Sequence, residues 1–328
     1  MYDIITFGSA TKDIFLKPRN FKILKDKKNF VTGNGICFNL GSKVEVEEMF
    51  FSSGGGGTNT AATFAKQGFS VAYCGAVGDD LAGKEIISEL NSLSVDTRFV
   101  FKTKRKPTNH SIILSGIDED RSIFVYRGAS EVLKNGDIPW DRLKTKWLYL
   151  APLSGKLCDL FEPLIDFAKK NKIKIAVNPG NTQLSLSKIV LERILKKVDI
   201  LILNQEEASF LTKISFQKEK EIFKKIDEVC DGVAIMTKGP KGVVISDGKY
   251  LYKALPLKSK VVDRTGAGDS FASGFVSGFI QSNGDIGQSI QFGVANSSAC
   301  LQEWGAKNGL LKKEEKFLKV KVQKTKIK

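Results

Sequence analysis

The sequence predicts an α/β protein with a doubly wound, mostly parallel sheet flanked by helices and a small β-sheet lid. Two observations lead to this prediction. Short β-rich apolar runs alternate with helical stretches along most of the chain, which is typical of βαβ units. Two segments break the alternation with strand-like patterns alone. The chain has 328 residues, of which 42% are hydrophobic and 27% charged, so it is long enough for one large α/β domain with an insertion.

The predicted elements of the main domain alternate along the chain. The apolar runs predicted as buried strands are residues 3–8, 71–77, 147–151, 173–178, 199–203 and 232–236. The stretches with helical spacing or composition are residues 60–68, 82–93, 156–171, 187–197, 206–211 and 219–229. The turn pair Asp247 and Gly248 then predicts an antiparallel hairpin.

Two excursions from the main domain, residues 15–51 and 99–127, contain alternating segments with no helix between them. They predict one small sheet that serves as a lid or a dimer surface. The main domain is predicted to comprise residues 1–14, 52–98 and 128–311. Residues 312–328 form a Lys-rich C-terminal tail. Because the second apolar face of a small sheet needs a cover, we expect a homodimer through the lid.

The composition excludes several classes of function. The single histidine, His110, excludes metal centres with several histidines and limits a Ser-His-Asp triad to one position. The five cysteines lie far apart, which argues against a disulfide framework or a thiolate zinc site. No run reaches about 18 apolar residues, and the first residues lack a signal-peptide pattern. We therefore expect a cytoplasmic protein that does not span a membrane.

The net charge of +15 is unevenly placed, because eight lysines lie in the tail. A second basic stretch, residues 102–106, has no interleaved aromatic residues, so no specific nucleic-acid partner is expected. We interpret the lysines as a solvated surface that also attracts anionic ligands such as nucleotides.

Two glycine-containing segments suit a polar ligand to different degrees. Residues 54–57 are four glycines that lead into a predicted helix, so backbone amides can approach a ligand there, although a flexible turn explains the cluster equally well. Residues 78–84 have the spacing of a P-loop. The next residue is Glu85, where a P-loop needs a hydroxyl group, and we therefore exclude a P-loop.

The strongest motif is residues 263–275, where a strand-like entry leads through small residues into a helix. Gly266, Ala267 and Gly268 can present successive amides at the helix N-terminus, which predicts an anion hole. Asp269 follows, and a carboxylate beside an anion site is a candidate general base. The alternative is a carboxylate that only complements the helix dipole.

Two polar segments, residues 204–207 and 237–242, each follow a predicted buried strand. Open α/β sheets bind ligands beyond the carboxyl ends of their strands, so both segments are candidates for a nucleotide site. Taken separately, each is also compatible with an ordinary turn.

In order and spacing, these motifs resemble the ribokinase or PfkB family of carbohydrate and nucleoside kinases. The resemblance covers about residues 3 to 310. It rests on the glycine cluster through Asn59, residues 75–83, Asn204-x-x-Glu207, Thr237-x-Gly239-x-x-Gly242 and residues 263–269. It implies a ribokinase-like fold and an ATP-dependent, magnesium-requiring kinase that phosphorylates a hydroxyl of a small sugar or sugar acid.

The resemblance also implies roles for individual residues. Asp269 matches the catalytic base, and Gly266, Ala267 and Gly268 match the anion hole for the transferred phosphoryl group. The positions that match the ATP site are Asn204, Glu207, Thr237, Gly239 and Gly242, with Glu207 ordering magnesium through water. The positions that match the acceptor site are Asp13, Gly54, Gly55 and Asn59. Asp263 and Thr265 match the surroundings of a monovalent cation, with potassium as the candidate.

The acceptor stays open at this point. Ribokinases place a carboxylate after the strand that corresponds to residues 147–151, and residues 151–154 here are Ala-Pro-Leu-Ser, so ribose is not the expected acceptor. The segment around Arg127 resembles the lid strand of 2-keto-3-deoxygluconate kinases and some nucleoside kinases. Arg127 is therefore a candidate for binding a substrate carboxylate, with a surface arginine as the alternative.

Three other functions compete with a sugar kinase. A nucleoside kinase would use the same machinery on a different acceptor. A nicotinamide-dependent dehydrogenase is disfavoured, because the first predicted strand-to-helix turn, residues 8–12, lacks the glycine triplet of a dinucleotide site. A non-catalytic protein that binds through the basic tail is the third alternative.

Overall fold

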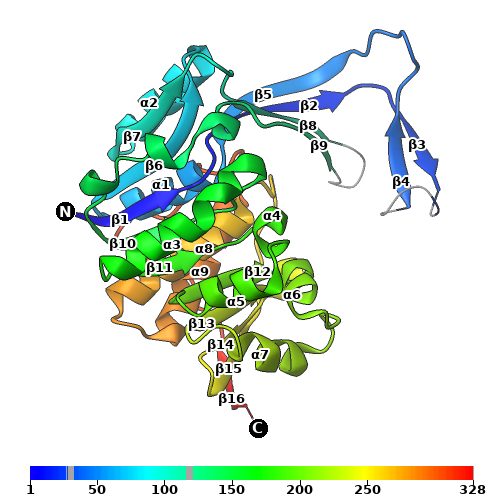
Figure 1. Ribbon diagram of the computed structural model, residues 1–328. Coiled ribbons are helices and arrows are strands. Elements are labelled where there is room, and N and C mark those ends of the chain that lie inside the picture. The colour runs from blue at the N-terminus through cyan, green and yellow to red at the C-terminus, as the bar shows by residue number, and fades with distance from the viewer. Residues whose placement is uncertain (27, 29–32, 116–120, 328) are drawn as a thin grey trace.

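A ten-stranded sheet forms the centre of the main domain, in the order β16-β15-β14-β13-β12-β11-β10-β1-β6-β7 (Figure 1). The computed structural model describes residues 1–26, 28, 33–115 and 121–327, so parts of both predicted excursions and the last residue lie outside the described residues. The neighbouring strands β13, β12, β11, β10, β1, β6 and β7 run parallel to one another. The pairs β13-β14, β14-β15 and β15-β16 are antiparallel. The strands are β1 (Tyr2–Phe7), β6 (Val71–Gly78), β7 (Val95–Thr103), β10 (Thr145–Leu150), β11 (Lys174–Val177), β12 (Ile200–Asn204), β13 (Val233–Thr237), β14 (Val243–Ser246), β15 (Tyr250–Ala254) and β16 (Gln323–Lys326).

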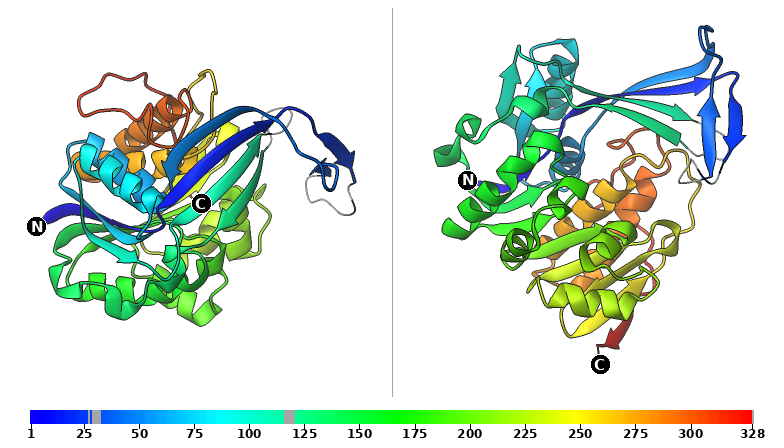
Figure 2. Two further views of the ribbon diagram at one scale, coloured as in Figure 1. Left: turned by 90° about the horizontal axis from the view of Figure 1, so that it is seen from above. Right: turned by 45° about the vertical axis from the view of Figure 1, so that its right-hand side comes forward.

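Helices cover both faces of this sheet (Figure 2). Ile5 and Leu148 share one core cluster with residues of α3, α5, α6 and α7, whereas their neighbours Ile4 and Tyr149 share another with α1, α2, α8 and α9. The helices are α1 (Gly56–Lys66), α2 (Leu81–Ser92), α3 (Phe161–Lys170), α4 (Asn181–Leu184), α5 (Lys188–Leu195), α6 (Gln205–Thr212), α7 (Glu219–Asp227), α8 (Ala267–Gln281) and α9 (Ile286–Cys300), with 3-10 turns at Ala129–Val132, Asn135–Asp137, Trp140–Arg142, Gly155–Leu160 and Gly239–Lys241. Adjacent residues of a strand point to opposite faces of the sheet, and both faces are apolar. The strands therefore appear in the sequence as continuous apolar runs.

The predicted fold class is confirmed, and each predicted strand and helix of the main domain overlaps an observed one. None of the helices in the described part of the chain is long and apolar enough to span a membrane.

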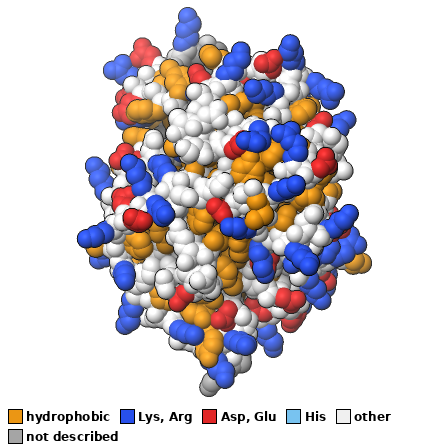
Figure 3. Space-filling model, turned by 90° about the vertical axis from the view of Figure 1, so that its left-hand side faces the viewer, with side chains coloured by type: hydrophobic (Ala, Val, Ile, Leu, Met, Phe, Trp, Pro, Cys, Tyr) orange, Lys and Arg blue, Asp and Glu red, His pale blue; other side chains and the backbone are white. Residues whose placement is uncertain are grey.

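On the face drawn in Figure 3, Lys and Arg side chains are dispersed and interspersed with Asp and Glu.

The lid is a four-stranded sheet that projects from the main domain, in the order β5-β2-β8-β9. Its strands are β2 (Thr11–Pro18), β5 (Val46–Gly54), β8 (Asn109–Ser115) and β9 (Arg121–Tyr126), and a separate pair beyond it is β3 (Lys22–Lys25) with β4 (Asn34–Cys37). The prediction of one small sheet is therefore corrected to a four-stranded sheet and a two-stranded one. The second excursion also begins later than residue 99, because β7 continues to Thr103 along the edge of the central sheet.

The Lys-rich C-terminal segment has exposed lysines, but its backbone is attached to the main domain. Strand β16 pairs with β15 and extends the central sheet. The backbone N–H of Lys313 donates to Lys66 O at 2.9 Å, and the side chain of Gln291 exchanges hydrogen bonds with the backbone of Val320. The lysines of residues 312–328 therefore decorate a segment whose backbone belongs to the main domain.

Candidate active site

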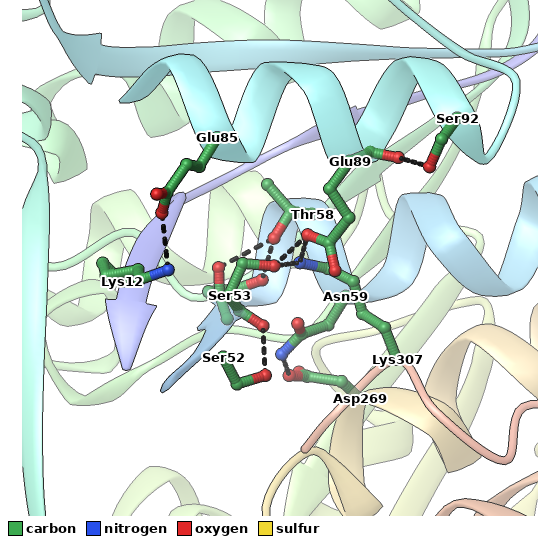
Figure 4. Close-up of polar contacts among 12 residues, drawn as sticks. Lys12, Ser52, Ser53, Thr58, Asn59, Glu85, Glu89, Ser92, Asp269 and Lys307 are labelled. Atoms are coloured by element: carbon green, nitrogen blue, oxygen red, sulfur yellow. Dashed lines mark hydrogen bonds and ion pairs between the residues drawn. The ribbon is translucent and has the colours of Figure 1, made fainter. Parts of the chain in front are cut away.

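Asp269 lies in the first turn of α8, at the place where the small residues of the motif end. Its Oδ2 accepts a hydrogen bond from Nδ2 of Asn59 at 2.8 Å, and this bond joins α8 to α1 (Figure 4). Burial raises the pKa of Asp269, while the hydrogen bond from Asn59 and the positive charge of Lys307 oppose the rise. A carboxyl group whose pKa is raised from its ordinary value is better suited to accept a proton at neutral pH.

The residues before Asp269 present the N-terminus of α8 to open space. Gly266 caps the helix with a φ of 77°, and a Cβ there would lie 2.3 Å from Cβ of Ala306, so only glycine fits. Neither the backbone conformation nor the packing requires glycine at position 268, since a Cβ there would meet nothing within 4 Å. The first backbone N–H groups of a helix have no partner within it, so this end can bind an anion.

A cavity of about 560 Å³ opens beside this helix end. Ala267 and Gly268 line it together with Thr237, Gly239 and Gly242, three of the positions predicted for ATP. Much of the remaining wall is apolar: Pro240, Pro256, Leu257, Phe271, Val294 and Leu301. An apolar slot that ends at helical N–H groups suits a flat ring system joined to phosphates.

Asn204 and Glu207 do not line this cavity; they cap α6. Asn204 Oδ1 accepts from the N–H of Glu207, and Glu207 Oε2 accepts from the N–H of Asn204, both at 2.8 Å. Asn204 ends β12 opposite Thr237, the last residue of β13, so the pair lies at the same edge of the sheet as the cavity. Burial raises the pKa of Glu207 above its ordinary value.

Asp13 is buried on β2, on the side of the lid that faces the main domain. Burial raises its pKa to about 6 from an ordinary 3.8, against a hydrogen bond with Ser111 and the charge of Lys307. Gly54 lies directly against this carboxylate, because a Cβ at Gly54 would be 1.9 Å from Asp13 Oδ2. The structure thus brings Asp13 and Gly54, two of the positions predicted for the acceptor site, into contact.

The glycine cluster, residues 54–57, lies close to Asp269 as well as to Asp13. Gly55, with a φ of 96°, caps α1, and a Cβ at Gly56 would come within 3.6 Å of Asp269 Oδ1. The amide oxygen of Asn59 is buried with no hydrogen-bond partner among the described residues. An unpaired acceptor beside a base is a natural partner for a ligand hydroxyl.

Asp263 and Thr265 are bonded to each other and to the lid. Oδ1 of Asp263 accepts from N and Oγ1 of Thr265 at 2.9 and 2.8 Å, and Oδ2 accepts from the N–H of Gly305 at 3.0 Å. The guanidinium of Arg121 donates to Thr265 Oγ1 at 2.7 Å and lies 3.5 Å from Asp263 Oδ1. A positive charge therefore already faces the carboxylate of Asp263.

A second cavity, of about 250 Å³, lies between the lid and the loop before α8. Its walls include Phe15 and Ile113 of the lid and Trp304 of the main domain. The ring of Trp304 stacks on Phe50 with centroids 4.9 Å apart and meets Phe15 edge-on at 6.2 Å. Phe15 stands two residues beyond Asp13 on the same face of β2, so the cavity extends the acceptor side of the site.

Arg127 follows β9 with an exposed side chain beside Gly155, so the structure places it at the loop after β10 and not against Asp13. Three site residues were not predicted from the sequence: Arg121, Trp304 and Lys307. Lys307 lies in a short loop between two glycines of positive φ, Gly305 and Gly309. This spacing is the only local signal, and the lysines that follow in the sequence obscure it.

Similarities to known proteins agree with this geometry. The profile of the pfkB family of carbohydrate kinases matches residues 29–313. A ribokinase of Lactococcus lactis subsp. lactis is 32% identical over 301 residues, covering 89% of this chain and 94% of that one. A nucleoside kinase of Methanothermobacter thermautotrophicus is 26% identical over 270 residues, covering 81% and 83%.

Solved structures share the fold at lower identity. The ribokinase of Thermotoga maritima superposes with a TM-score of 0.76 at 22% identity, covering 96% of this chain and 97% of that one. The ribokinase of Arabidopsis thaliana, solved with ribose and ATP, gives a TM-score of 0.75 at 21% identity, covering 95% and 96%.

Proposed function

The chain belongs to the pfkB family of carbohydrate kinases and is a phosphotransferase with an alcohol group as acceptor, and from this premise we propose that it transfers the γ-phosphoryl group of ATP to a hydroxyl of a small sugar or sugar acid. The observation that carries the proposal is the position of Asp269. Its carboxylate is adjacent to Gly268, which lines the larger cavity, and its charge acts on Asp13 on the acceptor side.

In this proposal Asp13 and the amide oxygen of Asn59 accept hydrogen bonds from acceptor hydroxyls and orient one of them toward Asp269. Asp269 takes the proton of that hydroxyl as its oxygen bonds to the γ-phosphorus and the bond from phosphorus to the ADP oxygen breaks. The N–H groups at Gly266, Ala267 and Gly268 stabilise the negative charge on the transferred group. The lid closes over the acceptor and excludes water, which would otherwise compete as a nucleophile.

The magnesium expectation fits the donor set. No group of three carboxylate, histidine or cysteine side chains gathers within the described ranges, so an all-protein cage is absent there. Mg²⁺ commonly keeps several waters and binds through phosphates with one or two carboxylates. Glu207 and Asn204 would hold it through water, and the ion would neutralise phosphate charge.

A nucleoside is the second candidate acceptor, favoured by the smaller cavity. Phe15, Ile113 and Trp304 give it a partly aromatic and aliphatic wall, and Phe15 stands two residues beyond Asp13 on the same strand. Apolar and aromatic walls are typical of sites for flat heterocycles.

An ADP-release assay with ATP and Mg²⁺ tests the proposal across ribose, fructose, fructose phosphates, 2-keto-3-deoxygluconate, adenosine, cytidine and inosine, with and without potassium. A strong response to one sugar or sugar acid supports the first candidate, and a response confined to nucleosides supports the second. Absence of both turnover and ATP binding would contradict the proposal. We expect no marked response to potassium, because Arg121 faces Asp263.

We also propose that the protein forms a homodimer through the outer face of the lid and acts in the cytoplasm without a specific nucleic-acid or membrane partner. The exposed apolar side chains on that face are Met49, Phe51, Ile112, Phe124 and Tyr126. A contiguous apolar face of this kind is typical of an interaction surface.

A further inference from the structure

The ammonium group of Lys307 is buried next to the acceptor site, and the chemistry proposed above does not use it. Lys307 is 5% exposed and lies in the loop after α9. Its Nζ donates to Ser53 Oγ at the end of β5 and to Glu89 Oε2 of α2, the latter at 3.1 Å, and Ser53 Oγ donates to the same carboxylate (Figure 4). Burying a lysine is costly unless it is paired.

The charge of Lys307 reaches both carboxylates of the site. It lowers the pKa of Asp13 and of Asp269, while burial raises the pKa of each. In turn, both carboxylates and Glu89 oppose the lowering of the Lys307 pKa that burial causes. Burial lowers the pKa of Lys307 on balance, and its ammonium form, held by Glu89, acts on both functional carboxylates.

Among the residues that the structure describes, the other groups whose charges act on Asp13 or Asp269 supply no such cation. The carboxylate of Asp263 faces Asp13 and raises its pKa. Tyr149 and Cys300 face Asp269 as neutral groups, because burial raises the pKa of both side chains above their ordinary values. Lys66 faces Glu89 and Cys300, and its Nζ donates to the backbone oxygen of Lys307 at 2.9 Å.

We propose that Lys307 is a positioning residue of the kinase site: its ammonium, held by Ser53 and Glu89, supplies the positive charge that allows Asp13 and Asp269 to be ionised together. The inference rests on the proposed function, which assigns these carboxylates to the acceptor and to proton transfer. Two carboxylates that share a buried site resist joint ionisation, and a base must be ionised to accept a proton.

The same cluster positions the backbone beside Asp13. Ser53, which accepts from Lys307, directly precedes Gly54, and Gly54 lies against Oδ2 of Asp13. Loss of the ammonium group would thus remove both a charge and a hydrogen bond from this wall of the site. A purely structural role would predict only the second effect, and pH dependence separates the two.

The test compares Lys307→Met with Lys307→Arg, which keeps the charge, in the full-length chain. With an acceptor identified in the ADP-release panel, we expect the acidic limb of kcat/KM in Lys307→Met to move up by about one pH unit or more, because the carboxylates then protonate more readily. Lys307→Arg should keep the limb close to that of the unmodified chain. Lys84→Met, at an exposed position of α2, makes the same change in net charge and should leave the profile unchanged.

A second measurement does not depend on turnover. NMR titration of protein labelled with ¹³C at aspartate carboxyl groups, assigned with Asp13→Asn and Asp269→Asn, should show both transitions at higher pH in Lys307→Met. Glu89→Gln removes the competing charge and should move the same transitions to lower pH. This variant keeps the inference testable if Lys307→Met does not fold.

Unmoved transitions in folded Lys307→Met would overturn the inference, as would a uniform fall in kcat at every pH with no shift of the limb. Failure of the proposed function looks different: the unmodified chain would then turn over no member of the panel, while the NMR titrations would still report on Lys307.

Discussion

Asp269 is held between opposing electrostatic effects. Burial raises its pKa, whereas the amide of Asn59, the charge of Lys307 and the N-terminus of α8 all favour the ionised form. The two interpretations that the sequence left open, a general base and a partner of the helix dipole, are therefore compatible. A carboxylate stabilised by the helix end can also take a proton from a neighbouring hydroxyl.

Asp269→Asn keeps the shape of this side chain and removes its basicity. We expect kcat to fall by about a hundredfold or more, on the usual scale of a lost general base. ATP affinity should change little, because the cavity wall is untouched. ADP release measures the first effect and titration calorimetry the second, with the exposed Asp231→Asn as the matched control. Turnover equal to that of the unmodified chain would contradict the role of Asp269.

We predict that the ionised side chain of Asp13 lowers the free energy of unfolding. Its pKa in the folded chain, about 6, lies above the ordinary 3.8, so the folded state binds the proton more tightly than the unfolded state. Its contribution to stability is therefore greatest at low pH and falls as pH rises from about 4 to 6. Above pH 6 the buried ionised carboxylate costs up to about 3 kcal/mol.

Asp13→Asn should accordingly raise the free energy of unfolding at pH 8 and bring no such gain at pH 4, while it weakens use of the acceptor. Urea titration at the two pH values measures the first effect, and the KM for the acceptor measures the second. An equal change in stability at both pH values would show that ionisation of Asp13 is not the cause.

At the scale of elements, the start of α6 gives a structural reason for a motif that the family resemblance assigns to the ATP site. Asn204 and Glu207 satisfy each other's backbone N–H groups as a capping box. The spacing of three residues follows from this local geometry alone. A role in binding magnesium must therefore be separated from the role in capping.

Glu207→Gln makes this separation, because glutamine can also complete a capping box but carries no charge. We expect thermal stability to stay close to that of the unmodified chain, and a higher Mg²⁺ concentration to be needed for half-maximal ADP release. Asn204→Ala is the contrasting variant, which should lose about 1 kcal/mol of stability with its cap. An unchanged Mg²⁺ requirement in Glu207→Gln would assign Glu207 to capping only.

At the scale of the whole molecule, the lid meets the main domain through specific contacts. Trp304 packs against Phe15 and Phe50, and Arg121 reaches Thr265 in the loop before α8. The inner face of the lid thus forms part of the site. Its outer face presents exposed Phe51, with 57% of the residue accessible, and Phe124, with 60%.

We expect a dimer at micromolar concentration in sedimentation velocity, and a monomer when Phe124 is replaced by Asp, because a buried unpaired charge is costly in an apolar interface. Ile189→Asp is the control: Ile189 is 78% exposed on α5, away from the lid. A monomeric unmodified chain, or a dimer that survives Phe124→Asp, would exclude this face as the interface.

Local patterns by themselves determined the alternation of strands and helices, the glycine cluster that leads into α1, and the entry to α8 with Asp269 in its first turn. Each of these depends on residues close in sequence, whose periodicity and backbone preferences report on local structure. Tertiary structure decided the rest. It paired residues 323–326 with the edge of the central sheet, joined Asn59 to Asp269 across 210 positions, and brought Lys307 to Ser53 across 254. Packing creates such contacts between distant segments, and the electrostatic balance among Asp13, Asp269 and Lys307 exists only after the chain has buried them together.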